Sequence, residues 1–356
     1  MEIIEVLLHV KNTPDNFVAG QIKYCFSRWE LLTNDIEILT TVRGLPIALK
    51  KEISPSKFVQ HKFSSKENFF VESEINDLLR KRAISSCVHE NGEVISPIFV
   101  RPKPDNKFRL ILNLKNLNKY IEYIHFKMDT LSSILRLVRP NCFMAKLDIK
   151  DAYYSVSIRF LDQKLLKFNF NGILYKFNVL PNGYSEGPRV FTKLLKPPLA
   201  KLRNANICIA AYIDDLFTMN SEFNGCVSNV KEITSLLDHL GFTIHPEKSI
   251  FTPSQKIEFL GMIIDSVSMS VTLTEEKKLS IKQICKNLLS EQRVKIREVA
   301  SILGKFSSSF IAVPHGRLHY RNLDGDKNVA LIFHKGNFDK TWSLSERAKD
   351  DIKWWM

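Results

Sequence analysis

The sequence lacks the continuous run of ~20 apolar residues that a membrane-spanning helix needs, although 44% of its 356 residues are hydrophobic. It also lacks a secretory signal, because Glu2 follows the first methionine and no basic segment precedes the first apolar stretch. Its six cysteines are far apart and form neither a Cys-x-x-Cys pair nor a Cys/His quartet with zinc spacing. These absences predict an intracellular protein of a reduced compartment, nucleus or cytoplasm, that is neither secreted nor bound to a membrane.

Positively charged residues are in excess. The chain has 51 Lys and Arg against 38 Asp and Glu, a formal net charge of +13. Such an excess predicts a polyanionic partner, most often nucleic acid, although the solvated lysines of an ordinary basic protein would give the same total. The basic residues are spread along the chain, which favours a folded surface over a disordered arm. No internal repeat or low-complexity segment is present, and the length predicts two or more core-bearing units.

Local patterns predict a mixture of helices and strands. Apolar runs at 95–100 and 108–114 flank turn residues 104–106, which predicts a hairpin with a basic tip. A helix is expected from Glu72 to Ala83, and another from Ser185 to about Lys196, where Pro197-Pro198 should interrupt it. Further strands are expected at 143–149, 165–170, 173–177, 207–213, 216–219 and 257–264, and helices capped by Thr274 and around Val299–Phe310 follow.

Three carboxylates stand at the ends of predicted strands. Asp148 ends one apolar strand, and Asp214 and Asp215 stand together at the bend of an expected hairpin. Because successive side chains of a strand alternate faces, we expect Asp214 to share a metal site with Asp148, and Asp215 to lie at its margin. Clustered carboxylates repel, and Mg²⁺ relieves that repulsion. A simple polar turn would also explain an Asp-Asp pair, and on these residues alone both interpretations stay open.

Six motifs occur in an order that resembles the reverse transcriptases. The resemblance covers about 170 residues. The motifs are Lys-Phe-Arg-Leu-Ile-Leu-Asn-Leu-Lys-Asn-Leu-Asn (107–118), Leu-Asp-Ile-Lys-Asp-Ala-Tyr-Tyr-Ser-Val-Ser-Ile (147–158), Leu-Pro-Asn-Gly-Tyr-Ser-Glu-Gly-Pro-Arg-Val-Phe (180–191), Tyr-Ile-Asp-Asp (212–215), Gly-Phe-Thr-Ile-His-Pro-Glu-Lys-Ser (241–249) and Phe-Leu-Gly-Met (259–262).

The flanking segments resemble a particular group of retroelements, the DIRS-like (tyrosine-recombinase type) retrotransposons. They are Ala-Gly-Gln-Ile (19–22) with Trp29, Ser-Pro-Ile-Phe-Val (96–100), His-Phe-Lys-Met (125–128) and Val-Pro-His-Gly-Arg-Leu-His (313–319).

The resemblance implies an α+β fold with the right-hand arrangement of fingers, palm and thumb, in which helices back an antiparallel palm sheet. The domains would be an N-terminal extension (1–70), fingers and palm (71–268), a helical thumb (269–325) and the start of a connection to a following, absent domain (326–356). Relatives usually continue into an RNase H domain, and the abrupt end at Trp354-Trp355-Met356 suggests truncation.

The resemblance also implies the reaction: a primer 3′-hydroxyl attacks a deoxynucleoside triphosphate, directed by an RNA or DNA template. Asp148, Asp214 and Asp215 would be catalytic. Asp148, Asp214 and the backbone carbonyl of Ile149 would hold two Mg²⁺ ions, for which Mn²⁺ could substitute. The expected partners are a template-primer duplex and dNTPs, with no membrane.

Further residues carry family roles by similarity. Arg109 and Lys103 would bind the triphosphate. The Tyr153 ring would exclude a 2′-hydroxyl, although a core aromatic would also explain this residue. Asn182 departs from the larger residue, commonly Phe or Gln, that most relatives carry. The expected nucleotide-binding set is Lys103, Arg109, Asp151, Ala152, Tyr153, Asn182, Gly183 and Lys248; the expected primer- and template-binding set is Tyr212, Phe259, Leu260, Gly261, Lys305, Arg317 and Arg321.

Two other functions are compatible with these motifs. An RNA-templated RNA polymerase would share the palm and its acids, but it usually carries Gly-Asp-Asp and a small polar sugar reader, unlike Tyr-Ile-Asp-Asp (212–215) and Tyr153. A catalytically inactive remnant of a retroelement that only binds nucleic acid is disfavoured by the intact acids, Arg109 and Tyr153.

Overall fold

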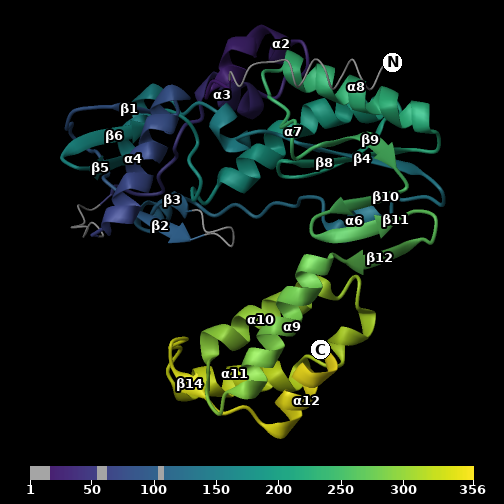
Figure 1. Cartoon of the computed structure of the whole chain (residues 1–356). Coiled ribbons are helices and arrows are strands. Elements are labelled where there is room, and N and C mark those ends of the chain that lie inside the picture. The colour runs from purple at the N-terminus through teal and green to yellow at the C-terminus, as the bar shows by residue number, and fades with distance from the viewer. Residues whose placement is uncertain (1–16, 54–61, 103–107) are drawn as a thin grey trace. The chain divides into compact units, whose positions relative to one another are not determined.

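A computed structural model describes residues 17–53, 62–102 and 108–356 of the chain, which divides into two compact units (Figure 1). The first unit comprises residues 1–130 and 145–253, and the second comprises residues 131–144 and 254–356. Within the described residues, no helix is at once long enough and apolar enough to cross a bilayer.

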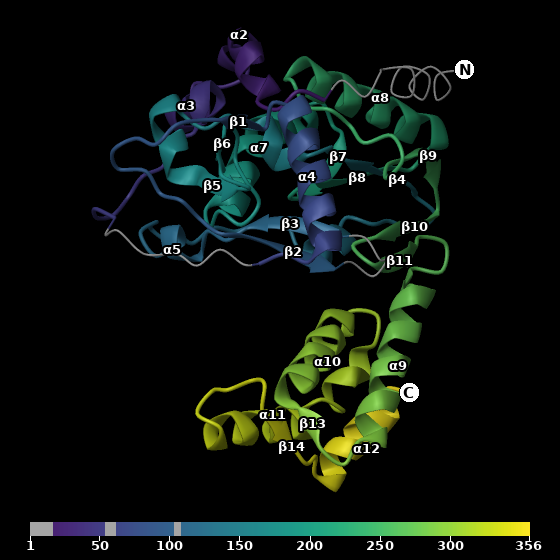
Figure 2. The same ribbon diagram turned by 60° about the vertical axis from the view of Figure 1, so that its left-hand side comes forward.

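A four-stranded sheet in the order β7-β8-β4-β9 is the centre of the first unit. Its strands are β4 (Phe143–Asp148), β7 (Cys208–Tyr212), β8 (Asp215–Asn220) and β9 (Ile250–Ser254). Helices α7 (Gly187–Asn204) and α8 (Phe223–His239) cover one face of this sheet (Figures 1 and 2). Strands β7 and β8 form the predicted antiparallel hairpin, and the predicted helix-backed palm sheet is confirmed.

Helix α7 corrects one prediction. It runs straight through Pro197-Pro198 to Asn204, whereas the sequence predicted that the prolines would interrupt it. A proline inside a helix costs ~3 kcal/mol. The apolar face of α7 offsets this cost, because each leucine that it buries is worth ~1.5–3 kcal/mol. The buried leucines of this face are Leu194, Leu195, Leu199 and Leu202.

Smaller sheets make up the rest of the first unit. β2 (Ile98–Pro102) and β3 (Phe108–Leu112) form the predicted hairpin, and β1 (Ile84–Ser86), β6 (Ile173–Phe177) and β5 (Lys167–Phe170) form a three-stranded sheet. Beside it lies α4 (Ser65–Arg80), which starts seven residues before the predicted Glu72 because Ser64 and Glu67 form a capping box. The other elements are α5 (Lys115–Asn118), η2 (Ala152–Ser155) and η3 (Phe160–Leu166).

The N-terminal elements pack against the palm sheet's helices. They are η1 (Gln21–Cys25), α2 (Phe26–Glu30) and α3 (Ile36–Gly44). Trp29 is fully buried and its indole Nε1 donates to the carbonyl of Leu240 over 3.1 Å. Gly241 follows with φ +88°, and its Cα faces the backbone of Ile22 and Gln21 so closely that a Cβ would lie 3.1–3.2 Å from their atoms.

The second unit is mainly helical. A three-stranded sheet of β10 (Lys256–Phe259), β11 (Met262–Asp265) and β12 (Ser270–Leu273) precedes its helices, so the single strand predicted at 257–264 is instead a hairpin that turns at Leu260-Gly261. Both turn residues have positive φ, which breaks the strand there. The remaining elements are α6 (Leu131–Leu135), α9 (Glu275–Ser290), β13 (Val294–Lys295), α10 (Ile296–Ser309), η4 (Pro314–Arg317), α11 (Arg321–Phe333), β14 (Thr341–Trp342) and α12 (Glu346–Trp354).

The helices of the second unit share one apolar core. Thr274 caps α9 as predicted, since its side chain accepts a hydrogen bond from the Lys277 N–H. Trp355 is buried and stacks on Phe306 of α10, with ring centroids 4.2 Å apart and planes at 11°. The two C-terminal tryptophans therefore have the packing partners that the sequence predicted they need.

Replacement of Gly241 should weaken the packing of the N-terminal elements against the palm. We expect Gly241→Ala to lower the free energy of unfolding by about 2 kcal/mol or more, because a left-handed alanine costs ~1–2 kcal/mol and its Cβ would also press on the backbone of η1. Gly172→Ala is the matched control, with φ +80° but no atom within 4 Å of the new Cβ. Denaturant unfolding measures both, and equal losses would contradict the close packing.

Candidate active site

The structure brings the three predicted acids together at one end of the palm sheet. Asp148 ends β4, Asp214 lies in the turn between β7 and β8, and Asp215 begins β8, the strand next to β4. The backbone N–H of Ile149 donates to the carbonyl of Asp214 over 2.9 Å and ties the two segments. Ile213 in the same turn has φ +56°, a conformation that a β-branched residue rarely adopts.

The carboxylates lie close enough to oppose each other's ionisation. Burial raises the pKa of Asp148, which is only 6% exposed, and the charge of Asp215 adds to the rise. Burial likewise raises the pKa of Asp214, and the charges of Asp215 and Asp148 raise it further. Lys248 opposes the effect at Asp148, with Nζ 3.9 Å from Oδ1, but its side chain is 63% exposed. This end of the sheet therefore holds concentrated negative charge that a cation would stabilise.

Tyr153 lies beside these acids. It belongs to η2, which follows Asp148, and its ring packs edge-on against Phe191 of α7 with centroids 5.7 Å apart. Burial raises its pKa to about 12, and the charge of Asp214 contributes to the rise. The ring is half-buried and neutral, and a Cβ at Gly187 would lie 3.8 Å from it.

Asp151 and Ala152 form the connection between Asp148 and Tyr153. Asp151 has a left-handed backbone (φ +45°), and its Oδ2 lies 3.0 Å from Nζ of Lys81. Ala152 is buried. Lys81, at the end of α4, is a residue that sequence reasoning missed.

The loop at Gly183 is held by another residue that sequence reasoning missed. Asn118 Nδ2 donates to the Gly183 carbonyl over 2.9 Å, and its Oδ1 accepts from the Ser185 N–H over 3.1 Å. Gly183 has φ +97°, and a Cβ there would lie 3.4 Å from the Leu112 carbonyl of β3. Asn182 is exposed and its side chain hydrogen-bonds to Tyr154. The signal for Asn118 was its place at the end of the first motif.

A cavity of about 470 Å³ adjoins this loop, lined by residues of β2, β3 and α5 and by Gly183. Arg109 is exposed on β3 opposite Arg101 of β2, which gives the hairpin its predicted basic surface. Lys103 lies outside the described residues.

The remaining predicted residues divide between the two units. Tyr212, opposite Asp215 in the hairpin, belongs to the first. In the second unit the Phe259 side chain is fully buried in the core, which leaves the turn at Leu260 and Gly261 as the accessible part of that motif. Among the thumb residues, Lys305 Nζ lies 3.0 Å from Ser280 Oγ, Arg317 lies 5.5 Å from the Phe310 ring, and Arg321 is exposed at the start of α11.

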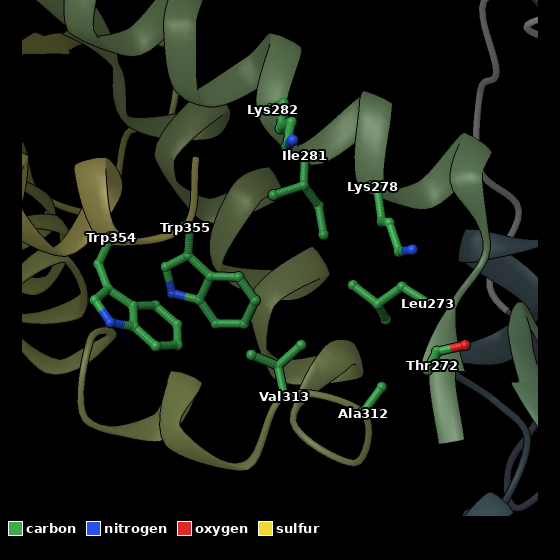
Figure 3. Close-up of a pocket in the computed structure, with 9 residues that line it drawn as sticks. All are labelled: Thr272, Leu273, Lys278, Ile281, Lys282, Ala312, Val313, Trp354 and Trp355. Carbon is green, nitrogen blue, oxygen red and sulfur yellow. The ribbon is translucent and has the colours of Figure 1, made fainter. Parts of the chain in front are cut away.

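The second unit has a cavity of its own, of about 340 Å³ (Figure 3). Trp354 and Trp355 form one wall, Ile281 and Leu273 the opposite side, and Lys278 and Lys282 project from α9 above it. No carboxylate lines this cavity, so it does not resemble the acidic end of the palm sheet.

Comparison with known families agrees with this geometry. Residues 101–264 match the family model described as reverse transcriptase (RNA-dependent DNA polymerase). Residues 101–264 are thus similar to the reverse transcriptase domain of retroelement polyproteins. That domain spans the acids, Tyr153 and the Gly183 loop, and the match confirms the function class that the six motifs predicted.

The relatives of the reverse transcriptase domain are viral and transposon polyproteins. The Pro-Pol polyprotein of simian foamy virus type 3 (strain LK3) is 25% identical over 261 residues, which are 73% of this chain and 21% of that protein. The Transposon Tf2-3 polyprotein of Schizosaccharomyces pombe is 24% identical over 188 residues, 52% of this chain and 14% of that protein. The chain thus spans about a fifth or less of the length of these relatives.

Solved structures similar to this one confirm the right-hand polymerase fold. The foamy viral protease-reverse transcriptase in complex with an RNA/DNA hybrid has a TM-score of 0.68 at 20% identity, covering 87% of this chain and 39% of that one. The same protein in complex with dsDNA has a TM-score of 0.67 at 22% identity, covering 88% and 61%. The DIRS-like subtype is not tested by these matches and stays a prediction.

Loss of Asn118 should loosen the Gly183 loop. We expect Asn118→Ala to raise the KM for dNTPs roughly ten-fold, because two hydrogen bonds of ~1 kcal/mol each hold the loop. Asn116→Ala, on the same helix, removes only an exposed contact to Lys119 and is the control. Steady-state primer extension measures both variants, and an unchanged KM in Asn118→Ala would show that the loop does not depend on this side chain.

Proposed function

We propose that this chain is an RNA-directed DNA polymerase that adds dNTPs to a primer 3′-hydroxyl. One observation carries the proposal: Asp148 and Asp214, from distant parts of the sequence, meet beside the Tyr153 ring, where the Ile149 N–H donates to the Asp214 carbonyl over 2.9 Å and the charge of Asp148 helps to raise the pKa of Asp214. The family match over residues 101–264 supports the same reaction.

The residues present fit a pair of divalent cations. Among the described residues, no group of three or more His, Cys, Asp or Glu is placed so that it could hold a metal ion. Mg²⁺ does not need such a group, because it is commonly bound by one or two carboxylates with water and substrate phosphates as the other ligands. Asp148, Asp214 and the carbonyl of Ile149 are the ligands that we propose. When bound, such ions activate an attacking hydroxyl and stabilise a leaving pyrophosphate.

The chain's own residues bind and select the nucleotide. Exposed Arg109 on β3 is available to the triphosphate, and Lys248, 63% exposed, lies where it can reach a phosphate or protonate pyrophosphate. The Tyr153 ring is neutral at physiological pH and acts by its bulk against the sugar. The Gly183 loop allows close approach of the nucleotide or template.

The proposed partners are a template-primer duplex and dNTPs. A net charge of +13 favours a polyanion, and the similar solved structures hold an RNA/DNA hybrid and dsDNA. We assign duplex-backbone contacts to Arg317 and Arg321, which are both exposed, and to Lys305. These contacts should weaken with salt. The domain boundaries predicted from the sequence stay part of this proposal.

We further propose that the element is DIRS-like. The segment 19–22 and Trp29, which carry that resemblance, belong to the packed first unit rather than to a free tail, which supports their use as family markers. The genomic element that encodes the chain tests this: a neighbouring tyrosine recombinase supports the subtype, and an integrase reading frame contradicts it.

Asp214→Asn should abolish DNA synthesis. Loss of a ligand that stabilises the developing charge is worth several kcal/mol, so we expect extension with Mg²⁺ and dNTPs to fall by about 10³-fold. Primer extension on RNA and DNA templates measures this, with Asp350→Asn, an exposed acid of α12 paired with Lys353, as the active control. Equal activity in wild type and Asp214→Asn would refute the metal assignment, and extension with rNTPs alone would favour an RNA polymerase.

Tyr153→Val should admit ribonucleotides. Removal of the ring opens the space that a 2′-hydroxyl needs, and the steric cost avoided is ~1–3 kcal/mol, so discrimination should fall about 10- to 100-fold. Tyr153→Phe keeps the ring and should keep the discrimination. The ratio of kcat/KM for dNTP and rNTP measures it, and an unchanged ratio in Tyr153→Val would remove Tyr153 from this role.

A further inference from the structure

Lys146 is a cation inside the acidic end of the palm sheet. It precedes Asp148 by two residues on β4, so the two side chains share a face of the sheet. Its Nζ lies 3.0 Å from Oδ1 of Asp215 on the neighbouring strand β8, and both side chains are about one-fifth exposed (20% and 22%). A partly buried pair of this kind is screened by solvent less than a surface pair.

The other nearby cation differs in both distance and exposure. Lys248 Nζ is 3.9 Å from Asp148 Oδ1, and its side chain is 63% exposed. It can therefore move with a substrate, whereas Lys146 projects from the middle of the sheet and is fixed by its strand.

The three acids are consequently not equivalent. Asp215 Oδ1 forms an ion pair with the Lys146 ammonium at 3.0 Å, although within the described residues this buried oxygen accepts no hydrogen bond of good geometry. Asp214 contacts its own backbone N–H, and within the described residues no lysine or arginine forms an ion pair with it. Within the described residues, Asp148 forms one ion pair, the 3.9 Å contact to Lys248, although the charge of Lys146 also lowers its pKa. The ion pair with Lys146 thus occupies the Asp215 carboxylate, whereas the carboxylates of Asp148 and Asp214 stay available to bind a cation.

We propose that Lys146 is a positioning residue, which holds the Asp215 carboxylate through Oδ1 and so leaves Asp148 and Asp214 as the carboxylate ligands of the metal ions. This inference rests on the proposed function. Mg²⁺ needs open positions for water and substrate phosphates. A released Asp215 would compete for those positions, so it would tighten metal binding in the absence of substrate and slow the reaction.

Mn²⁺ binding to the whole chain without nucleotide, measured by electron paramagnetic resonance of the free ion, tests this directly. We expect Lys146→Met to lower the Kd for Mn²⁺ about five-fold, because the released Asp215 carboxylate can then act as a further ligand of the ion. We expect it to lower kcat of primer extension about 10- to 100-fold, the size of effect that is typical of residues in the outer shell of a metal site. Lys146→Arg retains the charge and should restore both values. Lys146→Met/Asp215→Asn should bind Mn²⁺ no more tightly than Asp215→Asn alone, because the competing carboxylate is then absent.

An unchanged Kd in a folded Lys146→Met variant would overturn the inference, and so would tighter binding that persists in the double variant. Should Lys146→Met fail to fold, Asp215→Asn tests the same point. It should weaken Mn²⁺ binding less than about three-fold, whereas Asp148→Asn should weaken it at least about ten-fold, and equal losses would overturn the inference. If the variants show these changes in Mn²⁺ binding but the wild-type chain extends no primer, the proposed function is contradicted and the role of Lys146 is still supported.

Discussion

Repulsion between the carboxylates of Asp148, Asp214 and Asp215 is the constraint on which the rest of the structure depends. Burial makes that repulsion worse, because it raises the pKa of Asp148 and Asp214 and so lowers the stability of their charged forms. The side chains do not hold one another there. The backbone does, through adjacent strands and the hydrogen bond from the Ile149 N–H to the Asp214 carbonyl. A site that keeps acids close at a cost in stability is expected where a cation is to be bound.

Apolar packing in other parts of the first unit offsets the free-energy cost of keeping the acids close. The palm sheet is backed by α7, which stays helical through two prolines because its leucines are buried, and by α8. The end of α8 is in turn covered by Trp29 of the N-terminal elements. With the sheet held in this way, the turn at Ile213 can keep a left-handed conformation that an isolated hairpin would lose. The strained turn and the clustered acids thus depend on the same apolar core.

Particular residues show where sequence reasoning worked and where it stopped. That Asp148 and the Asp214-Asp215 pair meet at one end of the sheet was predictable, since strand ends and six ordered motifs agree, whereas alternation of side chains does not apply to Asp214, which lies in the turn. Lys146 and Asn118 were not recognised, although both lie within or beside those motifs. Their roles depend on which strand lies beside β4 and on how the Gly183 loop folds back, and both are long-range contacts that no local pattern encodes. The uninterrupted α7 was missed for a related reason, because tertiary burial outweighed the local preference of proline.

The ring of Tyr153, which we propose selects the sugar, is positioned by other elements than the three acids. Tyr153 has its pKa raised to about 12, so its ring stays neutral across the physiological range and its contribution is steric. The ring is set by Phe191 and Gly187 of α7, whereas the acids are set by β4, β7 and β8. A substitution that changes the size of the Tyr153 side chain should therefore leave the electrostatics of the acids unaltered. Conversely, the ion pair between Lys146 and Asp215 bears on the acids without touching the ring. Under the proposed function, the choice between sugars and the binding of cations would therefore rest on different elements, α7 for the Tyr153 ring and β4, β7 and β8 for the acids.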